Sequence, residues 1–107
     1  MAVIHINEQS FEKLQASGKP FLVNYWAPWC VYCRRIGPAY EKIAEQFEGE
    51  LIVAKVNIDD EPALATKERI EVIPTLVLYR EGFDLGSIVA PESKARIEQF
   101  LAENLNQ

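Results

Sequence analysis

The sequence predicts an α/β domain in which a mixed β-sheet is covered by helices. In the first part of the chain, short apolar and β-branched runs alternate with longer segments whose apolar residues recur at helical spacing. Further along, two strand-like runs are separated only by Glu81-Gly82, which is typical of a tight antiparallel hairpin. Because 107 residues are an ordinary length for one domain, we expect residues 1–107 to form a single unit.

The elements of the first half have clear boundary signals. Asn7 can cap a first helix, which Gly18 and Pro20 end. The second strand is an apolar, aromatic and β-branched run, as expected for a buried strand. Pro38 falls inside the second helix and should kink it. We expect strands over 2–6 and 21–27, and helices over 8–16 and 30–47.

The second half is bounded in the same way. Acidic residues and Pro62 stand where a short third helix should begin, with charges that suit its N-terminus. Gly86 lies inside the last strand, where it indicates a bulge or a close approach of another chain segment. The last helix carries an apolar stripe that includes Ile97 and Phe100. We expect strands over 51–58, 75–80 and 83–89, and helices over 62–69 and 94–104.

The order of these elements limits the topology. The first three strands are joined through helices, so they should be parallel with right-handed crossovers, whereas the hairpin must be antiparallel. In sheets of this kind the working site lies at the carboxyl ends of the central strands. Cys30 falls at such an end, directly after the second strand.

Composition excludes several classes of function. The net charge of −5 lacks the basic footprint of a nucleic-acid-binding protein. The N-terminus has no basic region typical of a signal peptide, and no apolar run approaches the roughly 20 residues that span a membrane. Two cysteines are too few for a disulfide framework. We therefore expect a cytoplasmic, monomeric protein.

The two cysteines are placed for reversible disulfide chemistry. Cys30 and Cys33 are three positions apart at the start of a helix, where Cβ atoms lie roughly 5–6 Å apart. A disulfide needs about 3.8 Å between Cβ atoms, so a small adjustment can join or separate the two sulfurs.

The helix start also favours one of the two sulfurs as a nucleophile. Its free N–H groups and dipole stabilise a thiolate at Cys30, so we expect the pKa of Cys30 to lie below about 8.5. Cys33 should be less exposed, and it is placed to attack a mixed disulfide at Cys30. The sequence therefore predicts Cys30 as the nucleophile and Cys33 as the resolving cysteine.

The chain resembles the thioredoxin family over essentially its whole length, with motifs in the family's order and spacing. The terminal amphipathic helix also fits the family. The matching segments are Phe-Leu-Val-x-Tyr-Trp-Ala-Pro-Trp-Cys-x-x-Cys from Phe21, Pro38, Ala54-Lys55-Val56-Asn57-Ile58-Asp59, and Ile73-Pro74-Thr75-Leu76.

This resemblance implies the thioredoxin fold, a mixed five-stranded sheet in the order 1-3-2-4-5 flanked by four helices. It also implies a protein-disulfide reductase that serves electron transport and cell redox homeostasis. Its substrates would be protein disulfides, and its electrons would come from a separate flavin-containing reductase, with no cofactor bound to this chain. The bond between Ile73 and Pro74 would be cis, and Trp29, Ile73 and Pro74 would hold a substrate segment by strand addition.

The chain departs from the family at positions that we expect to tune it. Val31-Tyr32 stands where thioredoxins usually carry Gly-Pro, and known couples of this fold span roughly −270 to −120 mV. We expect a more oxidising couple here. Asn24 occupies the place of the family's buried aspartate, and an amide cannot accept a proton. Resolution should therefore be slower, and Lys55, without its acidic partner, should reach water.

One further departure concerns the groove for the substrate. Val89-Ala90-Pro91 stands where thioredoxins usually carry a glycine in a substrate-contacting loop. We expect the branched side chain of Val89 to reshape that groove.

Two alternative functions remain open. Tyr32 is similar to the residue before the second cysteine of glutaredoxins, but their glutathione-binding Gly-Gly is absent. Asn24 and Val89 would also suit a non-catalytic subunit that keeps the fold for docking. Two thiolates make half of a tetrahedral zinc site, and His5 has no matching spacing, so we expect no metal within one chain.

Overall fold

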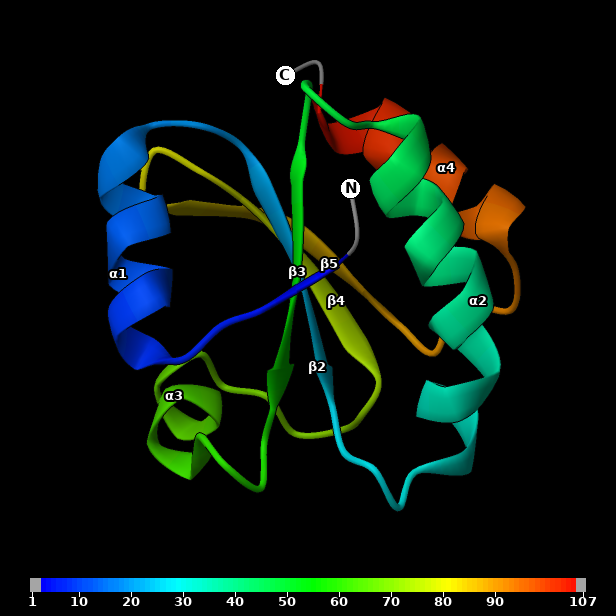
Figure 1. Cartoon of the computed structure of the whole chain (residues 1–107), viewed down its shortest axis with the longest axis horizontal. Helices are drawn as coiled ribbons and strands as arrows, with labels where there is room; N and C mark the ends of the chain where they lie inside the picture. Colours follow the sequence, from blue (N-terminus) through cyan, green and yellow to red (C-terminus); the bar gives the residue numbers. More distant parts are fainter. Residues whose placement is uncertain (1–2, 106–107) are drawn as a thin grey trace.

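The structure is a computed structural model that describes residues 3–105. It contains five strands and four helices within these residues (Figure 1). The strands are β1 (Ile4–His5), β2 (Phe21–Trp26), β3 (Ile52–Asn57), β4 (Thr75–Arg80) and β5 (Phe83–Val89). The helices are α1 (Glu8–Ser17), α2 (Val31–Gln46), α3 (Pro62–Lys67) and α4 (Lys94–Leu105).

The five strands form one mixed sheet in the order β1-β3-β2-β4-β5. β1, β3 and β2 are parallel, β4 is antiparallel to β2, and β5 is antiparallel to β4. Both the strand order implied by the resemblance and the predicted antiparallel hairpin are confirmed.

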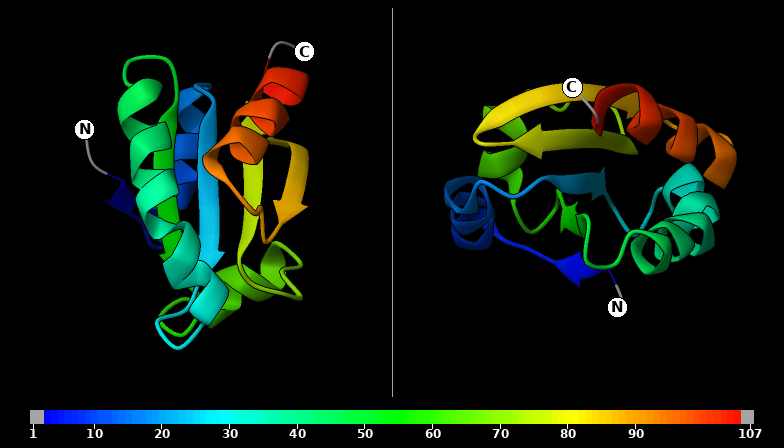
Figure 2. Two further views of the ribbon diagram at one scale, coloured as in Figure 1. Left: turned by 90° about the vertical axis from the view of Figure 1, so that its right-hand side faces the viewer. Right: turned by 90° about the horizontal axis from the view of Figure 1, so that it is seen from above.

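Helices cover both faces of this sheet (Figures 1 and 2). α2 and α4 lie on one face, where Tyr40 and Phe100 belong to a continuous apolar cluster. α1 and α3 lie on the other face, where Phe11 and Leu64 belong to a second cluster. β2 lies between the two clusters and is buried along almost its whole length, as its apolar sequence predicted.

The first strand and the third helix are shorter than the sequence indicated. β1 covers only two residues, although the N–H of Ile6 still donates to the carbonyl of Lys55 at 3.0 Å; Ala2 lies outside the described residues. α3 ends at Lys67 because Arg69 has a φ of 60°, which a right-handed helix cannot include. Glu61 precedes α3 without capping it through its side chain.

Other local predictions are confirmed. Asn7 caps α1, and its side chain accepts the N–H of Ser10. Glu81 and Gly82 both have positive φ, as a tight hairpin turn requires. Gly86 lies at a register shift in the β4–β5 ladder, and a Cβ there would lie 3.1 Å from Oδ1 of Asn104. α2 continues through Pro38; the kink expected there stays a prediction.

Candidate active site

The two cysteines lie in the short connection between β2 and α2, at the end of the sheet drawn at the bottom of Figure 1. They form a disulfide with 5.2 Å between their Cα atoms. Cys30 is the N-cap residue of α2, and its Sγ accepts the N–H of Cys33 at 3.2 Å. A helix donor therefore points at this sulfur, as the sequence predicted.

Both cysteines are buried, and they differ slightly in exposure. Cys30 is 8% exposed and Cys33 is 4% exposed, so Cys33 is the inner of the two. The two cysteines also have different neighbours. Cys30 borders an exposed apolar surface, whereas Cys33 lines a partly open cavity whose wall contains both apolar and charged side chains.

The loop before β4 faces Cys30. The Ile73–Pro74 bond is cis, as the resemblance implied, and the carbonyl oxygen of Ile73 lies 4.0 Å from Sγ of Cys30. Ile73 itself lies outside the ladder between β2 and β4, which begins at Thr75. The carbonyl of Pro74 accepts the N–H of Ala90 at 2.8 Å, which ties the end of β5 to the same loop.

Exposed apolar side chains gather around this loop and the cysteines. We call them the apolar rim. Trp29 and Tyr32 are its largest members, with 65% and 62% of their surface exposed. Single exposed apolar residues are common on proteins, but a group of this size around one disulfide marks a contact surface. The rim consists of Trp29, Val31, Tyr32, Val72 and Val89.

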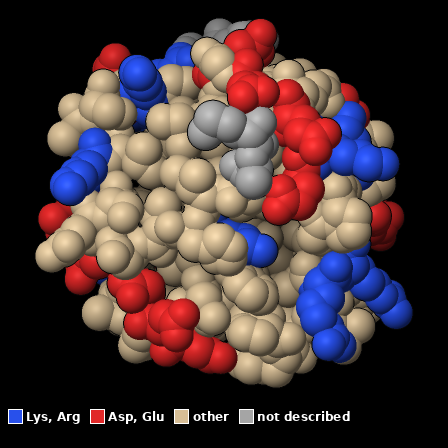
Figure 3. All heavy atoms as spheres, in the orientation of Figure 1, with Lys and Arg blue, Asp and Glu red and all other residues tan. Residues whose placement is uncertain are grey.

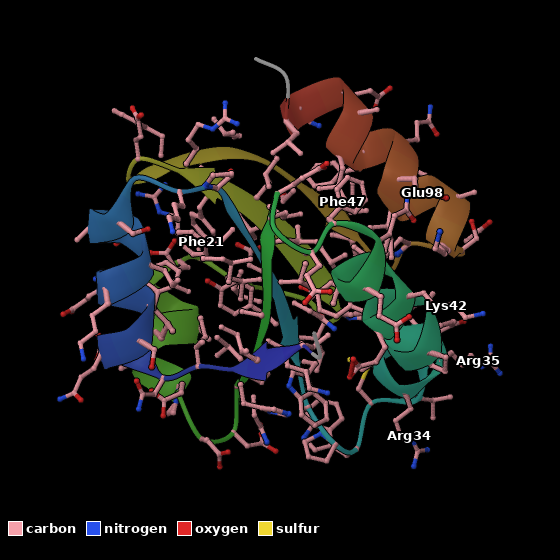
Figure 4. All side chains as sticks on the ribbon, turned by 45° about the horizontal axis from the view of Figure 1, so that its top comes forward. Phe21, Arg34, Arg35, Lys42, Phe47 and Glu98 are labelled. Carbon is pink, nitrogen blue, oxygen red and sulfur yellow. A yellow bond between two sulfur atoms is a disulfide. The ribbon has the colours of Figure 1, made fainter. Side chains whose placement is uncertain are left out.

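Contacts with charged residues hold the two aromatic side chains of the apolar rim. Nε1 of Trp29 donates to the carboxylate of Asp59, at 3.1 Å to the nearer oxygen, which fixes the ring. The guanidinium of Arg35 lies 5.4 Å from the centre of the Tyr32 ring. Arg34 and Arg35 point away from α2 into solvent (Figure 4). Basic side chains gather over the start of α2, and acidic ones lie on the side of α3 (Figure 3).

One residue of the Val89-Ala90-Pro91 segment has a backbone conformation that favours glycine. Val89 is exposed, as predicted, and pairs with Thr75 in the ladder. The next residue, Ala90, has a φ of 44°, a conformation that favours glycine. Within this segment the backbone thus singles out Ala90, and the expected effect of Val89 on the groove stays a prediction.

Cys33 and exposed residues of α2, Arg34 and Glu41 among them, line a cavity of about 180 Å³, which we call the Cys33 cavity. Asn24 lines it and is only 3% exposed, and its Oδ1 has no hydrogen-bond partner. Nε1 of Trp26, another lining residue, also lacks a partner. Lys55 is half-buried, with its ammonium 4.5 Å from the centre of the Trp26 ring; its expected contact with water stays a prediction. The predicted tuning residues Asn24 and Lys55 therefore line the same cavity as Cys33.

Sequence reasoning missed two further residues of this cavity. Gly37 and Glu41 line it from α2, four and eight positions after Cys33. Residues four apart lie on the same side of a helix, so counting turns from Cys33 would have found both. Asp59, the partner of Trp29, was also missed because it comes from the connection after β3.

Two kinds of feature are absent from residues 3–105. No group of three or more His, Cys, Asp or Glu side chains is arranged to hold a metal ion. None of the described helices combines the length and the apolar character of a membrane span.

Comparison with known proteins gives one consistent result. Residues 2–103 match the sequence model of the Thioredoxin family. Thioredoxin from Acidithiobacillus ferridurans is 39% identical over 105 residues, which are 97% of each chain. Thioredoxin 1 from Nostoc sp. is 35% identical over 97% of this chain and 98% of that protein. Together with the disulfide at the start of α2, these matches establish that the chain belongs to the thioredoxin family and is a protein-disulfide oxidoreductase.

Proposed function

We propose that Cys30 is the nucleophile of this oxidoreductase and that Cys33 resolves the mixed disulfide. The hydrogen bond from the N–H of Cys33 to Sγ of Cys30 is the observation that carries this assignment. The same donor, together with the dipole of α2, would stabilise a thiolate at Cys30. Cys33 is the more buried sulfur, so it is poorly placed to meet a protein substrate first.

Reduction of a substrate then takes two exchanges. The Cys30 thiolate attacks one sulfur of the substrate disulfide, and the other substrate sulfur leaves as a thiolate. Cys33 loses its proton and attacks Sγ of Cys30. The bond between Cys30 and the substrate breaks, the Cys30–Cys33 disulfide forms, and the second substrate sulfur leaves. The protein is oxidised by two electrons and the substrate is reduced by two.

The substrate segment would bind beside the loop before β4. The carbonyl of Ile73 lies near Cys30 and outside the ladder, where an extended peptide can pair with it. Trp29 and Val89 would contact side chains on either side of the substrate cysteine, and Pro74 would support the loop. An exposed apolar surface of this kind suits many substrates because it needs no specific hydrogen bonds.

Four other residues would tune the couple. Val31 and Tyr32 occupy the first turn of α2, so their backbone N–H groups bear on the thiolate of Cys30. Asn24 and Lys55 line the Cys33 cavity and would set the surroundings of the resolving thiol.

Regeneration needs a partner. Family membership supports protein disulfides as substrates and a reductase as the general source of electrons. We propose that a separate thioredoxin-reductase-like enzyme returns this protein to the dithiol, and that it works as a monomer with no bound cofactor. A cycle of this kind belongs in a compartment that keeps thiols reduced, so we place the protein in the cytoplasm.

Trapping of mixed disulfides tests the two roles. Cys33→Ser should accumulate adducts between Cys30 and substrate proteins, because the resolving thiol is missing. Cys30→Ser should accumulate none above the level of the double variant. Adducts would be counted on non-reducing gels after thiol blocking. Equal trapping by the two single variants would contradict the assignment.

Turnover assays separate this function from its alternatives. Insulin disulfide reduction should proceed with thioredoxin reductase and NADPH as the electron source. Turnover with glutathione alone would instead favour a glutaredoxin-like enzyme. Stable complexes formed equally well by the double serine variant would favour a docking subunit.

A further inference from the structure

The Cys33 cavity is lined by the proposed resolving cysteine and by one carboxylate, that of Glu41, which the exchange reaction described above does not use. Glu41 lines the same cavity as Cys33. One oxygen of its carboxylate, Oε2, accepts the N–H of Val3 at 3.3 Å, which holds the side chain toward β1 and the cavity. The two residues are eight positions apart on α2, or about 12 Å along a helix axis. This separation leaves room for water between the two side chains, and the cavity that both of them line offers a path for it.

The interior of the cavity suits ordered water. Its volume of about 180 Å³ exceeds what a single water molecule needs. Two buried polar atoms in its wall have no protein partner, the acceptor Oδ1 of Asn24 and the donor Nε1 of Trp26. Buried polar groups without protein partners are commonly satisfied by such water. A donor and an acceptor together can orient a chain of water molecules.

No side chain of α2 blocks the cavity between Cys33 and Glu41 at position 37. Gly37 lies on α2 between Cys33 and Glu41 and lines the cavity. A Cβ added to Gly37 would find nothing within 4 Å, and no left-handed φ demands glycine there. In the middle of a helix, glycine is less favourable than other residues. Here it leaves the path along α2 free of a side chain.

We propose that Glu41 accepts the proton of Cys33 through water held in this cavity, along the path that Gly37 leaves open. The inference rests on the proposed roles of the two cysteines. During resolution, the proton moves from Sγ of Cys33 through water to the Glu41 carboxylate. The Cys33 thiolate then attacks Sγ of Cys30, the substrate thiolate leaves, and Glu41 returns its proton to solvent. Asn24 cannot take this proton, because a neutral amide has no basic site of that strength.

The other charged groups around the cavity are cations. Arg34 from α2 and Lys55 from β3 line it with Glu41. Tyr40 also lines it, but its hydroxyl donates to backbone carbonyls, at 2.6 Å to that of Ala54. Among the described residues that line the cavity, Glu41 is therefore the only carboxylate, and so the only anionic group that can accept a proton.

A two-phase thiol reaction tests this route. The reduced protein would be mixed rapidly with 5,5′-dithiobis(2-nitrobenzoate). The first equivalent of thionitrobenzoate reports attack by Cys30, and the second reports resolution by Cys33. At pH 6, Glu41→Gln should slow the second phase about tenfold and leave the first unchanged. The matched control Glu45→Gln removes a carboxylate from the same helix outside the cavity and should change neither phase.

The pH profile separates proton transfer from a structural effect. The deficit of Glu41→Gln should shrink between pH 6 and pH 9, because hydroxide can then take the proton instead. A deficit of the same size at every pH, or an unchanged second phase, would overturn the proposal. A first phase no faster than that of a free thiol in the unaltered protein would instead contradict the role of Cys30.

Gly37 gives an independent variant with all carboxylates intact. Gly37→Met should place a side chain in the water path and slow the second phase as Glu41→Gln does. Gly37→Ala gains the same helix preference but leaves most of the path open, so it should slow this phase much less. An unchanged second phase in Gly37→Met would overturn the route through the cavity. Circular dichroism would confirm that each variant is folded.

Discussion

Two neighbouring residues of β2, Asn24 and Tyr25, place buried polar groups on opposite faces of the sheet. Only the group of Tyr25 has a hydrogen-bond partner. The hydroxyl of Tyr25 shares a hydrogen bond of 2.7 Å with that of Tyr79, which also lies 2.9 Å from the carboxylate of Glu68. We call these three residues the tyrosine cluster. Oδ1 of Asn24, one residue earlier, has no partner and faces the Cys33 cavity. A satisfied buried polar network stabilises a fold, whereas an unsatisfied group beside a disulfide points to chemistry.

The largest expected effect tests the tyrosine cluster by pH. Burial raises the pKa of both tyrosines of the cluster, and also that of Tyr40 on the other face of the sheet, above the usual value of 10.0. The stability that comes with a raised pKa is complete below the unfolded value near 10. Above that pH the unfolded chain loses protons that the folded chain keeps, so the free energy of unfolding should fall. The slope is about 1.4 kcal/mol per pH unit for each tyrosine.

Denaturant unfolding of the oxidised protein between pH 9 and pH 11 measures this fall. A free energy of unfolding that stays constant across this range would show that the buried hydroxyls are not as desolvated as the structure has them.

The next effect comes from breaking the cluster by mutation. Tyr79→Phe keeps the ring stacked on Phe21 but removes a hydroxyl, so Tyr25 and Glu68 each lose a partner. We expect the free energy of unfolding to fall by about 1–3 kcal/mol, the usual cost of an unsatisfied buried group. Disulfide reduction should not change. The control Tyr32→Phe removes an exposed hydroxyl and should leave the free energy of unfolding unaltered. Equal losses of stability in both variants would show that the buried hydroxyl of Tyr79 contributes no more than an exposed one.

The same comparison explains how far the sequence alone could go. The order of the elements, the cap at Asn7 and the hairpin at Glu81-Gly82 depend on short-range rules, and all three were predicted. The end of α3 was not, because the left-handed Arg69 has no signal in its own side chain. Glu61 fits the charge pattern of a helix start, but its carboxylate accepts the N–H of Glu8 instead, a contact across 53 positions.

In the candidate site, too, features that depend on local motifs were predicted, whereas features that depend on packing were not. The Cys30–Cys33 pair, the cis bond at Pro74 and the exposure of Trp29 follow from local motifs and the family resemblance. The Cys33 cavity does not, because it forms only when α2, β2 and β3 come together. Asn24 was recognised as a departure from the family pattern, but only the packed structure reveals that its oxygen lacks a partner and that Asn24 shares a cavity with Glu41.

A smaller effect is expected at the outer sulfur. Tyr32 has a backbone N–H in the first turn of α2, where it can favour a thiolate at Cys30. Tyr32→Pro removes this donor at a position that tolerates proline. Since the reduced form loses stabilisation, the potential should become more negative by about 30 mV, or about 1.4 kcal/mol. The equilibrium with glutathione measures it. Tyr32→Ala keeps the N–H, so equal potentials in both variants would exclude this cause.

The smallest effect on stability, with the opposite sign, is expected at Asn24. Asn24→Leu replaces the amide by an apolar side chain of similar size and removes an acceptor that has no protein partner. The free energy of unfolding of the oxidised protein should stay constant or rise by up to about 1 kcal/mol, because no protein hydrogen bond to Oδ1 is lost.

The same variant should slow resolution by Cys33, because an apolar wall orders less water in the cavity. A loss of stability as large as that of Tyr79→Phe would mean that Asn24 belongs with the tyrosine cluster as a structural residue. A gain in stability combined with slower resolution would instead mark Asn24 as a group retained for the chemistry of the inner sulfur at some cost to the fold.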